Sequence, residues 1–342
     1  MNSAKKDSKV LKETKRKIRV DFDRASAWQR FKIKYLSTHF LTKTIFKLFR
    51  FVILLGMCYI ILNPFFAKIS ASFMSPEDFT DVTVKYIPKH LTLDTYKTII
   101  TENSYWRCVF NTGTLSLVCA LIQTFVCSLV GYGFAKYKFK GSGILFGFVL
   151  LTMMIPPETI KFPMFLKFME FDVYGVLKLI GVGPIRLLDT SVPFVILSLF
   201  AIGLKNGLYI FMMRQFYKGI PDELEESAYI DGSSVFKTYF KIILPISIPM
   251  MITIFLFSFS WQWTDSFYTK LFYTSNTDSY VLAHFANIPG SLRAIADETG
   301  STLFKESIYH TCGLLIIAPL IIIYLFCQRY LIQGIERSGI TG

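Results

Sequence analysis

Residues 225–246 read EESAYIDGSSVFKTYFKIILPI, and this stretch decides how the chain is organised. It is an acidic, helix-forming segment between two apolar runs of membrane length. A helix is expected to start at Pro221, because proline suits the first helical position and the helix dipole favours the acids that follow. Asp231-Gly232 is expected to end that helix, since glycine adopts the left-handed conformation at little cost.

A second helix is predicted to begin after Ser233 or Ser234 and to end or kink at Leu244-Pro245. The segment is therefore interpreted as a helix–turn–helix lying on a membrane surface, which suits docking into a groove of another protein. An ordinary linker of two amphipathic helices is the alternative. Acid–base catalysis by these carboxylates is disfavoured, because no histidine or pocket is indicated beside them.

The composition is that of an integral membrane protein. Of 342 residues, 52% are apolar and 18% charged, with a mean hydropathy of +0.44. Residues 1–50 carry +11 of the net charge of +13. The remaining chain has too little positive charge for a basic surface, so a nucleic-acid partner is excluded.

Six apolar stretches have the length of a transmembrane helix, and the chain is expected to be an all-α polytopic membrane protein. They are residues 51–67, 109–135, 141–157, 190–213, 242–264 and 311–328. The segments that connect these stretches alternate between basic and non-basic. Because cytoplasmic loops carry an excess of Lys and Arg, the basic segments are expected in the cytoplasm, which places both termini and the segment 219–245 there. Their Lys and Arg residues include Lys136, Lys138, Lys140, Arg214, Lys218, Lys237 and Lys241.

Several motifs carry a resemblance to a known family. Glu226-Ser227-Ala228, then Gly232, then Ile242 and Leu244-Pro245 have the spacing of the EAA loop of ABC importer permeases, with Ser227 in place of the usual alanine. After residue 45 the chain resembles the maltose-type second permease subunit of carbohydrate importers. The other matching stretches are LTLDTY at 91–96, GYGFAKYKFKG at 131–141, MMIPPETIKFP at 153–163, YIFMMRQFYKGIPDELEESAYIDG at 209–232 and the C-terminal QGIERSGITG.

The resemblance implies a transport subunit rather than an enzyme, in the bacterial cytoplasmic membrane, that helps to form the path of a sugar or oligosaccharide. Its implied partners are a homologous second permease, two ATPase subunits and an extracellular solute-binding protein. ATP and Mg²⁺ would be bound by the ATPase, since this chain has no GxxxxGK[ST] motif and is expected to bind no cofactor. The residues implied to couple to the ATPase are Glu226, Ser227, Ala228, Asp231, Gly232, Leu244 and Pro245.

Two places are candidates for the translocation path. Lys205 and Asn206 lie inside the fourth apolar stretch, where a charge is costly and usually faces water or a bundle interior. Lys205 snorkelling to the membrane surface, or contacting a partner permease, is the alternative. Gln262 and Asp265, in WQWTDSF, are candidate sugar contacts, although an interfacial aromatic belt is favoured there.

The chain is expected to comprise a basic tail at 1–45 and a transmembrane domain at 46–342. The tail forms either a surface helix on anionic membrane lipid or a plain topology signal. Pro156-Pro157 indicates either a gate or a simple helix end. The four histidines lack ligand spacing, so no metal is expected, and the six cysteines are interpreted as buried thiols.

Three rival functions remain. One is an ABC permease for a polyol, glycerol phosphate or another non-sugar solute. The second is a self-sufficient secondary transporter, which is disfavoured because the apolar cores contain no Asp or Glu to bind a coupling ion. The third is a membrane enzyme, but no group of residues in the sequence indicates a catalytic site.

Overall fold

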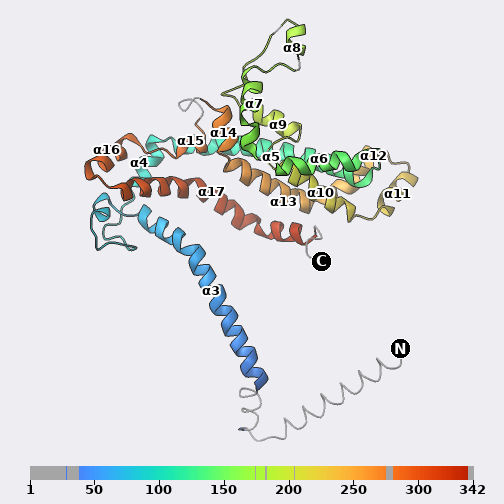
Figure 1. The fold of residues 1–342 in the computed structure, drawn as a ribbon. Helices are drawn as coiled ribbons and strands as arrows, with labels where there is room; N and C mark the ends of the chain where they lie inside the picture. Colours follow the sequence, from blue (N-terminus) through green and yellow to red (C-terminus); the bar gives the residue numbers. More distant parts are fainter. Residues whose placement is uncertain are drawn as a thin grey trace. The chain divides into compact units, whose positions relative to one another are not determined.

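The computed structural model describes residues 28, 38–173, 175–181, 183–203, 205–274 and 280–337. The named secondary-structure elements in these ranges are all helices (Figure 1). The chain divides into two units, Met1–Ala67 and Lys68–Gly342. The elements are α3 (Thr38–Ser72), η1 (Pro76–Phe79), α4 (Asp94–Glu102), α5 (Tyr105–Lys136), α6 (Ser142–Met154), α7 (Pro157–Met169), α8 (Val176–Leu179), α9 (Val192–Leu199), α10 (Asn206–Lys218), α11 (Glu223–Ile230), α12 (Val235–Thr238), the π-helical turn η2 (Tyr239–Ile243), α13 (Leu244–Trp263), α14 (Phe267–Phe272), α15 (Leu282–Phe285), α16 (Gly290–Thr299) and α17 (Thr302–Arg337).

Most of the expected N-terminal tail lies outside the described residues, so a surface helix there stays a prediction. The expected boundary at 45/46 falls inside α3.

Four of the six expected spans are long apolar helices in the described part of the chain. These are Thr42–Ser72, Tyr105–Lys136, Val235–Trp263 and Thr302–Tyr330, which correspond to the first, second, fifth and sixth predictions. The third is bent: α6 and α7 meet at 99° across Ile155-Pro156, so the pair is either a broken span or a re-entrant loop. The number of spans is thus four or five by length and composition, and six stays a prediction.

The fourth expected span, residues 190–213, is wrong as a continuous helix. It consists of α9 and α10, and the described residues between them, 200–203 and 205, are not helical. Ala201 is left-handed, with a φ of +54°, and the Ile202 amide donates to the Leu197 carbonyl at 2.9 Å. The Ala201 amide donates to Ser198 at 3.2 Å. These bonds form a Schellman helix end, which usually has glycine at the left-handed position.

α5 is the central helix of the second unit and packs against α9, α10 and α13. Gly131 permits the close approach of α10, because a Cβ there would lie 2.6 Å from the Cβ of Met213. Buried hydroxyls join the same helices: Ser128 Oγ lies 2.6 Å from the Tyr217 hydroxyl and 2.8 Å from the Tyr239 hydroxyl. Satisfied polar groups of this kind fix how helices pack when the surroundings are apolar.

The six cysteines form no disulfide. Cys108, Cys119, Cys127 and Cys312 are buried, as expected, whereas Cys58 is exposed and Cys327 half-buried.

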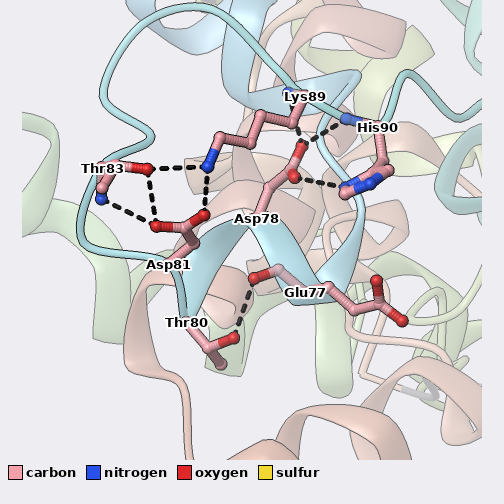
Figure 2. Close-up of polar contacts among 7 residues, drawn as sticks. All are labelled: Glu77, Asp78, Thr80, Asp81, Thr83, Lys89 and His90. Atoms are coloured by element: carbon pink, nitrogen blue, oxygen red, sulfur yellow. Dashed lines mark hydrogen bonds and ion pairs between the residues drawn. The ribbon is translucent and has the colours of Figure 1, made fainter.

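A polar network organises the segment between α3 and α4 (Figure 2). The buried Asp78 carboxylate accepts the backbone N–H groups of Lys89 and His90, each at 3.1 Å, and lies 2.9 Å from His90 Nδ1. Burial acts to raise the pKa of Asp78, but the bonds from His90 and Lys89 outweigh it and hold that pKa below its ordinary value. Asp81 pairs with Lys89 Nζ at 2.5 Å and with Thr83. The loop is therefore fixed by bonds along its own length.

Candidate functional site

The first candidate site is residues 219–245, termed here the loop segment. Its first helix, α11, has Glu223, Glu225 and Glu226 in its first turn. The helix ends in a Schellman motif, in which Ser233 N–H donates to Ala228 O at 2.9 Å and Gly232 N–H to Tyr229 O at 3.0 Å. Gly232 has a φ of +77°, so the predicted left-handed glycine at this helix end is confirmed.

Lys136, the last residue of α5, holds the start of α11. Its ammonium donates to the Ile220 carbonyl at 2.6 Å and to Asp222 Oδ1 at 2.5 Å, and lies 3.8 Å from Glu225 Oε1. The side chains of Lys136 and Glu225 are both buried. Sequence reasoning used Lys136 only as a topology signal. Its place in GYGFAKYKFKG, at the end of a predicted span, indicates only that it lies on the same side of the membrane as the loop segment.

The two carboxylates beside Lys136 differ in environment. Asp222 is exposed, and its hydrogen bond with Lys136 lowers its pKa. Burial raises the pKa of Glu225 above its ordinary value, while the charge of Lys136 acts in the opposite direction. The ion pair between Lys136 and the buried Glu225 therefore links the end of α5 to α11.

The residues expected to couple to a partner are not all exposed. Glu226, Ser227, Asp231 and Gly232 are exposed, but Ala228 is buried. The small side chain of Ala228 thus serves packing within the chain itself.

The loop segment also has exposed apolar side chains. The sequence analysis assigns no role to the most exposed of them. Ile230 is 87% exposed and Phe236 is 72% exposed. Tyr229 and Val235 are also exposed. Large apolar side chains gathered on one exposed segment are typical of a protein-binding surface. We call Tyr229, Ile230, Val235 and Phe236 the apolar patch of the loop segment.

Of the two expectations for Leu244-Pro245, a helix end is wrong and a kink stays a prediction. α12, η2 and α13 follow one another without a break, and Val235–Trp263 is one apolar helix. Proline lacks an N–H and its ring collides with the carbonyl of the preceding turn in a regular helix. The wider π-helical turn at Tyr239–Ile243 directly precedes it and accommodates this defect. Leu244 is half-buried and Pro245 exposed.

The second candidate site is a cavity of about 630 Å³ at the two helix breaks, termed here the break cavity. It lies where the α6–α7 bend, the α9–α10 break and the end of α13 meet. Its lining residues are Thr152–Pro157, Ile160, Ala201–Gly203, Lys205–Leu208, Trp261 and Thr264–Tyr268. Non-helical backbone is tolerated at membrane depth where it lines a cavity. The position of the two helix breaks at this cavity is consistent with that rule.

Lys205 and Asn206 both line the break cavity. Lys205 is exposed and left-handed, with a φ of +59°, and its ammonium lies 4.9 Å from the centre of the Trp261 ring. Asn206 is buried, and neither atom of its side-chain amide has a hydrogen-bond partner.

Asp265 also lines the cavity, but its carboxylate is occupied. Oδ1 accepts the amides of Phe267 and Tyr268 at 3.1 and 3.2 Å, and Oδ2 accepts the Thr269 amide and hydroxyl at 2.8 and 2.9 Å. Burial raises the pKa of Asp265, while these four bonds act to lower it. Asp265 therefore organises the start of α14.

Gln262 lies outside the cavity. It is buried in α13, and its Nε2 has no hydrogen-bond partner. The structure thus brings Lys205, Asn206 and Asp265 to one cavity and leaves Gln262 apart.

α10 connects the two candidate sites. Its first residue, Asn206, lines the break cavity, and its last, Lys218, leads into the loop segment. Thirteen residues of helix span roughly 20 Å. In Figure 1, α11 and α12 lie together at the end of the second unit away from α4 and α16.

Comparison with known families gives one match that spans both sites. The model described as "Binding-protein-dependent transport system inner membrane component" matches residues 127–337. This range contains the loop segment and every residue that lines the break cavity.

Curated relatives are similar over most of the chain. The arabinooligosaccharides transport system permease protein AraQ of Halalkalibacterium halodurans is 27% identical over 84% of this chain and 93% of its own. The polygalacturonan/rhamnogalacturonan transport system permease protein YtcP of Bacillus subtilis is 25% identical over 84% and 96%. The trehalose transport system permease protein SugB of Mycobacterium tuberculosis is 26% identical over 75% and 85%.

Among solved structures, the chain is similar in fold to a bacterial ABC transporter that imports the acidic polysaccharide alginate. The TM-score is 0.65 at 20% identity, over 84% of this chain and 97% of the other. A second structure, of an alginate ABC transporter in complex with an alginate-bound periplasmic protein, matches with a TM-score of 0.57 at 17% identity.

Proposed function

Because the chain belongs to the family of binding-protein-dependent transport system inner membrane components, we propose that it is one permease subunit of an ATP-driven importer of a sugar or oligosaccharide. The relatives described above are named for the transport of arabinooligosaccharides, of polygalacturonan/rhamnogalacturonan and of trehalose. Each of these names refers to a carbohydrate substrate.

The main support for the proposal is that α11 is fixed at both ends and exposed on its surface. The helix is held at its start by Lys136 and at its end by the Schellman motif at Gly232, yet its Glu226 and the apolar patch are exposed. A short, fixed, exposed helix has lost most of its conformational freedom before it meets a partner, which favours docking. We assign this docking to a separate ATPase subunit, which binds ATP and Mg²⁺.

Coupling requires that ATPase closure and one state of the permease stabilise each other. Lys136 joins α11 to α5, and α10 runs from the loop segment to the break cavity. A displacement of α11 can therefore reach the cavity directly along α10, and indirectly through α5, which packs against α9, α10 and α13. We place the loop segment and both termini on the cytoplasmic side, in agreement with the Lys and Arg distribution.

The proposed assembly contains this chain, a homologous second permease, two ATPase subunits and an extracellular solute-binding protein. The second permease is the partner that the resemblance to maltose-type importers implies. The relatives' family name refers to binding-protein-dependent transport, which supports the solute-binding protein.

The proposal is tested by reconstituting the complex into proteoliposomes with ATP and Mg²⁺ on the ATPase side. We expect uptake of a radiolabelled oligosaccharide that needs ATP hydrolysis, the binding protein and this chain together. Vesicles that lack this chain alone are the matched control. Uptake driven by an ion gradient without ATP would contradict the proposal and indicate a secondary transporter.

A further inference from the structure

The segment between η1 and α4, residues 80–91, has large apolar side chains on its surface, and we call it the return turn. Ile87 is 82% exposed and Tyr86 is 63% exposed, and Val82 and Leu91 are exposed as well. Large apolar side chains gathered on one exposed segment mark a site that meets another protein or a membrane. The loop segment and the break cavity lie elsewhere in the chain, so the proposed function gives this turn no role.

The return turn is closed at its base by bonds of its own. The buried Asp78 carboxylate accepts the backbone N–H groups of Lys89 and His90 (Figure 2). Met74 and Leu91 form an antiparallel β-bridge beside this network. The backbone therefore holds the turn in one conformation with its apolar side chains exposed.

The turn folds back along the end of α3. The chain leaves α3 after Ser72 and passes through η1, yet the Ser70 hydroxyl donates to the Tyr86 carbonyl. Further along, the Thr92 amide donates to the Phe73 carbonyl at 2.9 Å. The backbone of Tyr86 is therefore level with the last turn of α3, whereas the start of α4 lies beyond it.

α17 shows where this level lies relative to a membrane. The Ser307 hydroxyl donates to the Ala71 carbonyl at 3.0 Å, so the end of α3 is level with Ser307. The apolar stretch 311–328 of α17 begins four residues later, which is roughly 6 Å further along the helix. The interfacial layer on each side of the hydrocarbon core is roughly 5–7 Å thick. Ser307, Ala71 and the backbone of Tyr86 therefore lie in the interfacial layer.

The exposed side chains at this level suit that layer. Tyrosine is enriched at membrane interfaces, because its ring is apolar and its hydroxyl can bond to water or headgroups. Ile87 follows Tyr86 directly and adds apolar surface. Exposed apolar side chains also occur near the same level on α17, at Leu303 and Tyr309.

We propose that the return turn is a membrane anchor, in which Tyr86 and Ile87 insert into the interfacial layer of the lipid bilayer beside the end of α3. A soluble partner is disfavoured as the occupant, because the turn runs back to the level of the membrane interface instead of away from it. The proposal requires that α17 spans the membrane. It does not depend on the transported substrate or on the ATPase.

The test is photocrosslinking to lipid in the full chain, reconstituted with its partner subunits into vesicles of phosphatidylethanolamine and phosphatidylglycerol with radiolabelled acyl chains. Benzoylphenylalanine replaces either Tyr86 or Ile87. The same probe at Phe326, an exposed residue within the apolar stretch of α17, reports the yield of a lipid-facing position. The probe at Glu298, an exposed residue of α16, is the matched control for the apolar character of the probe itself.

We expect positions 86 and 87 to label phospholipid severalfold more strongly than position 298, with a yield comparable to that of position 326. A yield from positions 86 and 87 no greater than that from position 298 overturns the proposal. Crosslinks from positions 86 and 87 to the solute-binding protein or to the second permease in place of lipid also overturn it, and they would identify the turn as a protein-docking surface.

Failure of this proposal is distinguishable from failure of the proposed function. Crosslinking to lipid needs neither ATP nor substrate, so it is measured whether or not the vesicles take up sugar. ATP-dependent uptake without lipid crosslinks from the return turn would remove only the anchor.

Discussion

Gly232 sets the direction of the chain between α11 and α12, and its contribution is confined to the backbone. A Cβ at this position would meet nothing within 4 Å, so a side chain is excluded only by the φ of +77°. Gly232→Val is expected to destabilise the turn by about 1–3 kcal/mol, because a β-branched residue is strained there. We expect uptake and substrate-stimulated ATP hydrolysis to fall severalfold while the chain still inserts.

Gly232→Asn is the matched control, since asparagine adopts the left-handed conformation far more readily than valine. It should retain most of the uptake and hydrolysis. If Gly232→Val shows wild-type levels of both in the purified complex, the loop segment is a linker rather than a coupling element.

Single residues of the candidate sites were partly predictable. The spacing from Glu226 to Pro245 identified the loop segment, and glycine chemistry gave the left-handed turn. The burial of Ala228 was not predictable, because alanine suits a close contact with a partner and a close contact within the chain equally well. Asp265 was predicted from its type, but only the positions of four donors show that its carboxylate is occupied.

Among the elements, α5 and α11 are joined through Lys136, and this contact yields a prediction. Lys136→Met leaves the Ile220 carbonyl and the buried Glu225 without their cation. Removing one partner of a buried pair destabilises more than replacing both. We expect faster proteolysis of the loop segment and weaker coupling, whereas Lys136→Arg should preserve both.

The pH dependence of this contact has a definite sign. Burial already raises the pKa of Glu225, and loss of the opposing Lys136 charge raises it further. A group with a raised pKa in the folded state stabilises that state when protonated, and this stability is lost as pH rises through the folded pKa. Loop proteolysis in Lys136→Met should therefore increase with pH.

Adding Glu225→Gln to Lys136→Met should abolish that pH dependence and restore part of the protection. A pH profile identical in the single and double variants would show that Glu225 does not contribute through its charge.

The breaks between elements were the least predictable part of the fold. Pro156-Pro157 signalled the α6–α7 bend, because proline at both positions cannot continue a helix. The α9–α10 break carries no such signal: Ala201 takes the left-handed position that glycine usually fills. Hydropathy averages over this break, so residues 190–213 are predicted as one apolar span although α9 ends at Leu199 and α10 begins at Asn206.

For the whole molecule, the membrane orientation is the prediction that unites the sites. Single cysteines at Lys138 and Lys218, on either side of the α5, α10 and α11 junction, should react with an impermeant label only from the cytoplasmic side. A cysteine at Lys89, in the network of Figure 2, should react only from outside. Labelling at Lys218 from outside would contradict both the orientation and the coupling role.

Docking of α11 on the ATPase is tested by site-specific photocrosslinking in the assembled complex. A photoreactive amino acid replaces Ile230, which is 87% exposed in the apolar patch, or Val82, which is 91% exposed between η1 and α4. We expect a crosslink to the ATP-hydrolysing subunit from position 230 and none from position 82. A complex that hydrolyses ATP and transports sugar, yet gives no such crosslink from position 230 or gives it from position 82, would contradict the docking of α11 on the ATPase.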